Sequence, residues 1–316
     1  MGCIMTGSPL RLSGYVELPA HVGTGGFDHA AVHAASGHVY VAHTANDAID
    51  VLDPIARRHL YSVPGLPGVA GALVSDEAEL VFTSNRGENT IGVFAPGLNP
   101  GVTKIDVGVR PNGLAYDHRR QLVLAANVGD QAVPGSHTLS MIDLAQGGRR
   151  TEIAVSGRTR WAVYAPEEDL FFVNIMAPSE IVVVDPRQPD RVARTIAVPH
   201  AGAHGLDYDP ASRRLFCACD AGVLATLDAR TGDVLDEKPL SGVPDVVFFN
   251  RQRRHLYVAV GDPGVIDVFS TESMARLATV DTEPGAHTTA LSPAGDWLCA
   301  FLPRTHRAAI FEVTSP

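Results

Sequence analysis

The chain has 316 residues, of which 45% are hydrophobic and 19% charged. Such a chain can bury a sizeable core and is too hydrophobic to be intrinsically disordered. Its formal net charge of −10 disfavours a nucleic-acid partner, and no segment approaches the roughly 20 apolar residues of a membrane span. We therefore expect a folded, soluble protein that has neither nucleic acid nor a membrane as its main partner.

The N-terminal residues lack a basic segment followed by an apolar segment of secretory type. This predicts a cytoplasmic protein, unless a leader has been removed. The chain has four cysteines, Cys3, Cys217, Cys219 and Cys299, and in a protein of this length they do not indicate a disulfide framework. The oligomeric state stays open.

A repeat runs along almost the whole chain. Its first copy consists of three short apolar runs at Ala30–Val32, Val39–Ala42 and Ile49–Asp53. The runs that match the second of these are Leu80–Thr83, Leu122–Ala125, Leu170–Val173, Leu215–Ala218, Leu256–Ala259 and Trp297–Ala300. Those that match the third are Thr90–Phe94, Leu139–Asp143, Ile181–Asp185, Val223–Asp228, Val265–Phe269 and Ala308–Val313. Short β-branched or aromatic runs between Gly, Asp, Asn and Pro are typical of strands and turns, so we expect an all-β protein.

Seven copies of this unit predict a seven-bladed β-propeller with four-stranded blades. The last copy ends at Val313 after three strands, whereas the segment Leu12–Leu18 precedes the first copy as a spare strand. We expect this N-terminal strand to complete the last blade and so remove two exposed strand edges. Residues 1–316 should form a single propeller domain, with residues 1–10 flexible.

One position recurs where the chain enters the first strand of each blade. These positions are 41 to 48 residues apart, and they are Asp28, Ala70, Asn112, Arg160, His204, Asp245 and His287. In a propeller the first strands line the central channel, so these seven side chains should form a ring at one rim. We call this set the ring. The residues that follow two of them, His29 and Trp161, should point away from the axis, into the packing between blades, although Trp161 could form an apolar wall if blade four bulges.

Four members of the ring, His204, Asp245, His287 and Asp28, are consecutive around the closed circle. Two imidazoles and two carboxylates are suitable ligands for a divalent metal ion such as Zn, Mn or Fe. Such an ion would lower the pKa of a bound water or polarise a carbonyl group. The same residues would also suit a polar, water-filled channel without a metal, so both interpretations stay open.

Several segments resemble the YVTN and YncE-like family of seven-bladed propellers. They are Phe27–Val32 with Gly37–His43, the segment Arg110–Asp117, and Arg213–Phe216. The resemblance implies the propeller fold over nearly the whole chain. It implies little about activity, because this fold is found in binding proteins, lactonases and lyases.

We favour an enzyme over a binding protein. The sequence predicts a metal-dependent hydrolase, lyase or isomerase that acts on a small carboxylate-bearing molecule at the mouth of the channel. His204 and His287 would be catalytic, and Arg160 and Asn112 would orient the substrate. Without a metal, a histidine beside a carboxylate could still exchange protons near neutral pH. The alternative is a non-catalytic, YncE-like propeller that binds a peptide or a small ligand.

Overall fold

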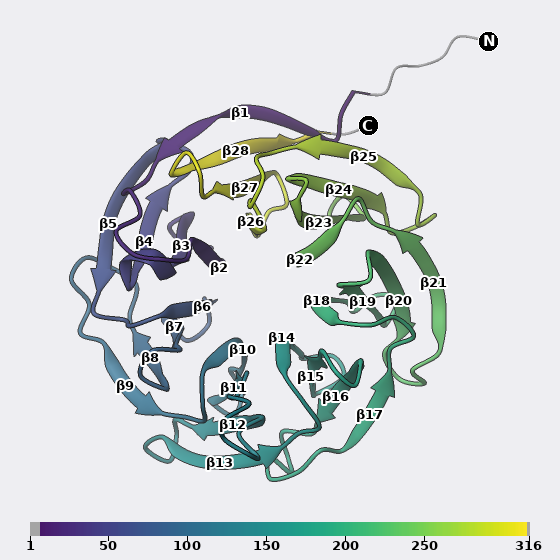
Figure 1. The fold of residues 1–316 in the computed structure, drawn as a ribbon. Helices are drawn as coiled ribbons and strands as arrows, with labels where there is room; N and C mark the ends of the chain where they lie inside the picture. The colour runs from purple at the N-terminus through teal and green to yellow at the C-terminus, as the bar shows by residue number, and fades with distance from the viewer. Residues whose placement is uncertain (1–6, 315–316) are drawn as a thin grey trace.

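Seven four-stranded antiparallel sheets surround a central axis (Figure 1). This computed structural model describes residues 7–314. The prediction of an all-β, seven-bladed propeller is confirmed, and the blades follow one another in chain order around the axis. A single short 3-10 helix, η1 (Thr44–Asn46), lies among the described residues. No helix in residues 7–314 is both long enough and apolar enough to cross a membrane.

Each blade begins with its innermost strand. Blade one has β2 (Phe27–His33), β3 (His38–His43), β4 (Ala48–Asp53) and β5 (Arg58–Pro64), and blade two has β6 (Val69–Ser75), β7 (Leu80–Asn85), β8 (Thr90–Phe94) and β9 (Thr103–Asp106). Blade three has β10 (Pro111–Asp117), β11 (Leu122–Asn127), β12 (Thr138–Asp143) and β13 (Arg149–Ala154), and blade four has β14 (Thr159–Ala165), β15 (Leu170–Ile175), β16 (Glu180–Val184) and β17 (Arg194–Ala197). Blade five has β18 (Ala203–Asp209), β19 (Arg214–Cys219), β20 (Val223–Asp228) and β21 (Val234–Pro239). Blade six has β22 (Val243–Asn250), β23 (His255–Asp262), β24 (Val265–Ser270) and β25 (Arg276–Asp281), and blade seven has β26 (Thr288–Leu291), β27 (Trp297–Leu302) and β28 (Arg307–Val313).

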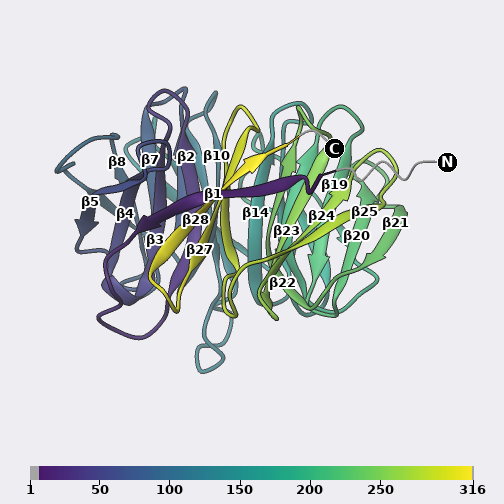
Figure 2. The same ribbon diagram turned by 90° about the horizontal axis from the view of Figure 1, so that it is seen from above.

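The N-terminal strand β1 (Leu10–Glu17) completes blade seven, as predicted. It pairs antiparallel with β28, and Figure 2 shows it crossing the outside of the molecule beside that strand. The strand begins at Leu10, which is 3% exposed and pairs with Val313, so this end of the segment expected to be flexible is ordered. Residues 1–6 lie outside the described part of the chain.

The core lies between neighbouring blades. The second strands β3, β7, β11, β15, β19, β23 and β27 are almost entirely buried, and their side chains pack against those of the adjacent sheets. The innermost strands approach one another so closely that some positions require glycine. A Cβ atom on Gly113 would lie 2.4 Å from the carbonyl oxygen of Arg160, and one on Gly205 would lie 2.1 Å from that of Asp245. These glycines therefore allow the inner strands of consecutive blades to approach each other closely.

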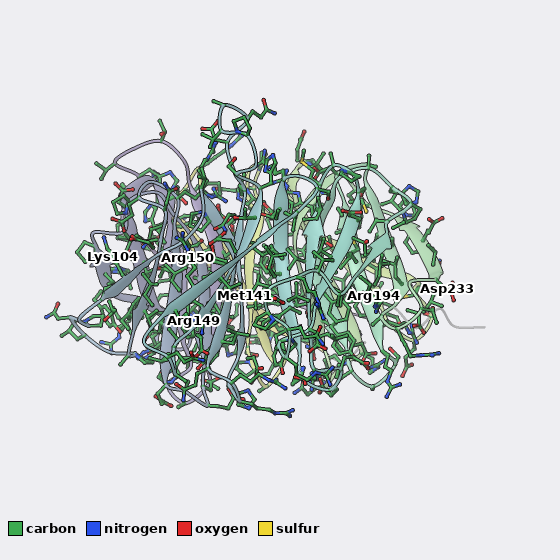
Figure 3. All side chains as sticks on the ribbon, turned by 90° about the horizontal axis from the view of Figure 1, so that it is seen from below. Lys104, Met141, Arg149, Arg150, Arg194 and Asp233 are labelled. Atoms are coloured by element: carbon green, nitrogen blue, oxygen red, sulfur yellow. The ribbon has the colours of Figure 1, made fainter. Side chains whose placement is uncertain are left out.

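The outermost strands form the polar lateral surface of the molecule. Lys104 in β9 and Arg149 and Arg150 in β13 are exposed there (Figure 3). Charged side chains on an outer strand discourage pairing with the strands of another chain.

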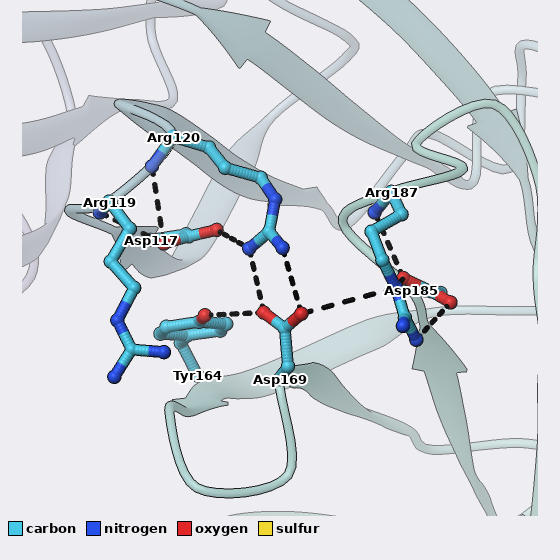
Figure 4. Close-up of polar contacts among 7 residues, drawn as sticks. All are labelled: Asp117, Arg119, Arg120, Tyr164, Asp169, Asp185 and Arg187. Carbon is cyan, nitrogen blue, oxygen red and sulfur yellow. Dashed lines mark hydrogen bonds and ion pairs between the residues drawn. The ribbon is translucent and has the colours of Figure 1, made fainter.

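An ion-paired network joins blades three and four at the rim opposite the ring (Figure 4). Arg120, in the turn after β10, donates from Nη1 to Asp117 of its own blade over 2.6 Å. It also donates from Nη1 and Nη2 to both oxygens of Asp169 in blade four, over 2.6 and 2.8 Å. The hydroxyl of Tyr164 donates to the same carboxylate over 2.9 Å. The hydrogen bonds from Arg120 are the largest reason why the pKa of Asp169 lies below its usual value.

We predict that Arg120→Ala lowers the free energy of unfolding by about 1–3 kcal/mol, because it leaves the buried carboxylate of Asp117 without its charged partner. The matched control is Arg119→Ala, which removes an exposed neighbouring guanidinium and should leave stability close to that of the wild type. Urea unfolding of both variants would measure this difference. Equal losses in the two variants would contradict a specific role for Arg120.

Candidate functional site at the channel mouth

A β-bulge shapes the mouth of the channel in six of the seven blades. In β2, for example, Phe27 pairs with His43 and Ala30 with Val41, so that Asp28 and His29 lie opposite Ala42 alone. The strands β6, β10, β14, β18 and β22 carry the same extra residue at the equivalent place. His287, in blade seven, directly precedes β26. A bulge redirects side chains out of strict alternation, and here it falls on the ring.

His204 is the centre of one half of the ring. Its Nδ1 atom lies 2.7 Å from Oδ1 of Asp220, and its Nε2 atom lies 3.3 Å from Oδ1 of Asp245. His287 approaches the other oxygen of Asp245, with its Nε2 atom 3.9 Å from Oδ2. Two of the four predicted metal ligands, His204 and His287, therefore lie beside the carboxylate of a third, Asp245.

These contacts favour the protonated form of His204. Burial by itself would lower the pKa of this imidazole, but the charge of Asp245 and the hydrogen bonds to Asp220 and Asp245 raise it to about 9. Burial likewise opposes ionisation of Asp245, but the charge and hydrogen bond of His204, together with the neighbouring histidines, outweigh it and hold the pKa of this carboxyl well below its usual range. At neutral pH this half of the ring thus contains an imidazolium between two carboxylates.

The other half of the ring is organised by arginines. Asp28 pairs with Arg86, whose Nη2 atom lies 3.2 Å from Oδ2, and the same guanidinium donates to Oδ1 of Asn112 over 2.6 Å. Arg160 extends toward Asp220, with Nη2 3.6 Å from Oδ2. Asp28 thus has a cation as its partner, and Asp220 connects the two halves because it contacts both Arg160 and His204.

His29 and Trp161 do not point away from the axis, and that prediction is wrong. They come from blades one and four, yet their ring centroids are 4.1 Å apart, so the two side chains meet across the channel. The bulge is the physical reason, because it turns both Asp28 and the residue after it toward the axis. Together with Phe248, 6.4 Å from Trp161, they form the floor of the mouth.

Two separate cavities lie at this end of the molecule. One of about 560 Å³, on the rim, is lined by His204, Asp245 and His287 and also by Arg304. Within the channel, His29 and Trp161 line a mostly apolar cavity of about 230 Å³. We use the word cup for the ring together with this floor.

His29 differs from His204 in its protonation. Its Nε2 atom lies 3.5 Å from Oδ1 of Asp28, and its side chain is buried. Burial lowers the pKa of His29, and the charges of Asp28 and Asp245 only partly oppose this effect. His29 is therefore a neutral imidazole at neutral pH, in the same cup as the His204 imidazolium.

The structure gives limited support to the donor set of the predicted metal site. Within residues 7–314, no three side chains of His, Cys, Asp or Glu are arranged so that they could hold a metal ion. The predicted ligands are divided, because Asp28 is engaged by Arg86 and His204 has a carboxylate at each ring nitrogen. The metal stays a prediction, and no catalytic step below depends on it.

Two important residues were missed by the sequence analysis. Arg86 and Asp220 lie directly after the second strands of blades two and five. The loops after these strands open on the same rim as the ring, so the position of a residue just beyond a second strand is the signal that could have found them.

No protein-family model matches the chain, and no curated protein matches its sequence. Among solved structures, a chain of Kuenenia stuttgartiensis hydrazine synthase is similar, with a TM-score of 0.80 and 14% sequence identity, over 96% of this chain and 100% of that chain. Identity this low shows a shared fold alone. Because 1759 chains of solved structures match, the fold does not indicate one activity. The similarity to YncE-like propellers therefore stays a resemblance.

We predict that stability falls as the pH rises through the range in which His204 titrates. The pKa of this residue is about 9 in the folded protein, against an ordinary value of 6.5. A raised pKa contributes stability that is complete below pH 6.5 and is lost as the pH rises through 9. The expected loss in the wild type is on the order of 2 kcal/mol, and His204→Gln should lack it. Urea unfolding across this range would measure the difference. Parallel pH profiles for the two proteins would contradict it.

Proposed function

We propose that this protein is an acid–base enzyme that binds a small carboxylate-bearing molecule in the cup and moves a proton on it. The observation that carries this proposal is the pair of histidines with opposite shifts. The pKa of His29 lies below the ordinary value, and that of His204 is raised to about 9. Two titratable groups whose surroundings push their pKa values apart are the usual arrangement of a catalytic base and a catalytic acid.

The two histidines have different roles in this proposal. His29, which is neutral, accepts a proton from the substrate. His204, which is protonated, stabilises the negative charge that develops and can return a proton. Asp220 and Asp245 hold the His204 ring in position, because each contacts one of its nitrogens. Both carboxylates also keep this imidazole charged.

Arg160 and Asn112 bind the carboxylate of the substrate. The planar guanidinium of Arg160 matches a carboxylate in shape and charge. Its nearest acid, Asp220, is at 3.6 Å and leaves donors of the guanidinium for a ligand. Asn112 accepts from Arg86 through its carbonyl oxygen, so its amide nitrogen is oriented to donate.

This set of groups suits removal of a proton from the carbon next to a carboxylate. The C–H bond breaks, His29 takes the proton, and the electron pair moves toward the carboxylate, where Arg160 and His204 stabilise it. Return of a proton to the same carbon gives an isomerase, and loss of a neighbouring leaving group gives a lyase. Both reaction types were expected from the sequence. A divalent ion would add Lewis-acid stabilisation of the same charge, and metal analysis of the purified protein tests for it.

We predict that the wild type exchanges the hydrogen next to the carboxylate of such molecules in D₂O. Proton NMR on 2-hydroxy acids, 2-oxo acids and dicarboxylates would measure the rate. His29→Phe keeps an aromatic floor but lacks the base, so it should reduce exchange at least ~100-fold, while carboxylate binding persists. Arg160→Ala should instead weaken binding about tenfold or more.

The matched control is His118→Ala, which removes a histidine that lines a cavity at the opposite end of the channel. It should keep both exchange and binding. Carboxylate binding without exchange in the wild type would favour the non-catalytic, YncE-like alternative. Absence of both binding and exchange would reject the proposed function.

A further inference from the structure

Four arginines gather on one arc of the rim that carries the ring. They are Arg86, Arg110, Arg158 and Arg160, from blades two, three and four, and we call them the arginine cluster. The protein as a whole has a net charge of −10, so such a concentration of cations is unexpected. Of the four, Arg86 has Asp28 and Arg160 has Asp220 as an acidic partner. Among the described residues, no carboxylate forms an ion pair with Arg110 or Arg158.

The cluster is electrostatically costly. The pKa of Arg158 lies below its usual value, first because of burial and then because of the charges of Arg160, Arg86 and Arg110. The charge of Asp220 acts in the opposite sense. Repulsion among like charges lowers the stability of the folded state. An anion bound between the guanidiniums would remove this cost.

A cavity of suitable size lies beside the unpaired arginines. Arg110 and Arg158 line a space of about 460 Å³ between blades three and four, together with His137. The connection from β11 to β12, which borders this cavity, is the long loop that projects beyond the rim in Figure 2. The acid in the lining is Asp130, and its Oδ1 atom accepts a hydrogen bond from the backbone N–H of Ala132.

We propose that the arginine cluster is a second subsite that binds the second anionic group of the substrate, either a phosphate or a second carboxylate. The inference rests on the proposed function, because it concerns a second anionic group of the same substrate. Arg160 belongs to both sites, so a molecule with one anionic group in the cup reaches Arg110 and Arg158 with the other. The substrate is therefore a small dianion or trianion, and the cluster selects it against monocarboxylates.

Isothermal calorimetry at low ionic strength tests the proposal, with inorganic phosphate, malonate and acetate as probes. The wild type should bind phosphate or malonate at least ~10-fold more tightly than acetate, because additional charge-assisted hydrogen bonds form. If only phosphate binds this much more tightly than acetate, the subsite takes a phosphate group. If only malonate does so, it takes a second carboxylate. The double variant Arg110→Ala with Arg158→Ala should lose this preference and keep acetate binding.

The control is the double variant Arg149→Ala with Arg150→Ala, which removes two exposed arginines from the outer strand of blade three. It has the same change in net charge and should keep the preference. An equal loss in the two double variants would mean that only the overall charge matters, and this would overturn the proposal. So would equal affinities of the wild type for all three anions.

Thermal unfolding gives an independent measurement. Because the unliganded cluster is repulsive, Arg158→Ala should unfold at the same temperature as the wild type or a higher one, and phosphate should raise the wild-type temperature more than that of the variant. A large fall in the variant would mean that Arg158 is structural and would overturn the proposal. Dianion binding at the cluster without proton exchange would reject the enzyme while supporting the subsite. Proton exchange on monocarboxylates without a preference for dianions would support the enzyme and reject the subsite.

Discussion

The bulge at the start of six of the seven inner strands is the constraint on which the site depends. In a regular strand, consecutive side chains point to opposite faces, so only one residue per blade would reach the axis at a given level. The extra residue in β2 and β14 turns two side chains inward, which gives both a ring and a floor. The close approach of the same strands, which Gly113 and Gly205 permit, brings residues of different blades within contact distance. Without this local irregularity the channel would have no cup.

The charges of the cup follow from how many carboxylates reach each imidazole. His204 and His29 are both removed from solvent, which disfavours the charged form of either. His204 has carboxylates at 2.7 and 3.3 Å, and these overcome the cost of burial. His29 has one at 3.5 Å, whose effect is reduced by Arg86 nearby. Two histidines on neighbouring levels of one channel therefore differ in charge.

The fold was largely predictable, and the site was predictable only in part. The repeat predicted the positions of the strands. The last copy has only three strands, which indicated that the N-terminal segment completes the last blade. The ring positions also came from the repeat, because they depend on backbone register. The partners of the side chains could not be predicted from the repeat. Asp28 turned out to be paired with Arg86 from the next blade, and His29 turned inward, because loops and bulges leave no periodic signal in a single sequence.

Arginines with close acidic partners at one rim contrast with Arg110 and Arg158 at the other. At the rim opposite the ring, Arg120 has Asp117 and Asp169, and Arg254 has Asp209 at 2.8 Å. These ion pairs join neighbouring elements, and the charges of these arginines are already compensated by acidic side chains. At the ring rim, Arg110 and Arg158 have no acidic partner among residues 7–314, and the charge of neighbouring arginines acts against Arg158. Selection for stability alone would remove such repulsion, because a single substitution would suffice. Because these arginines line a cavity, we infer that an anion binds there.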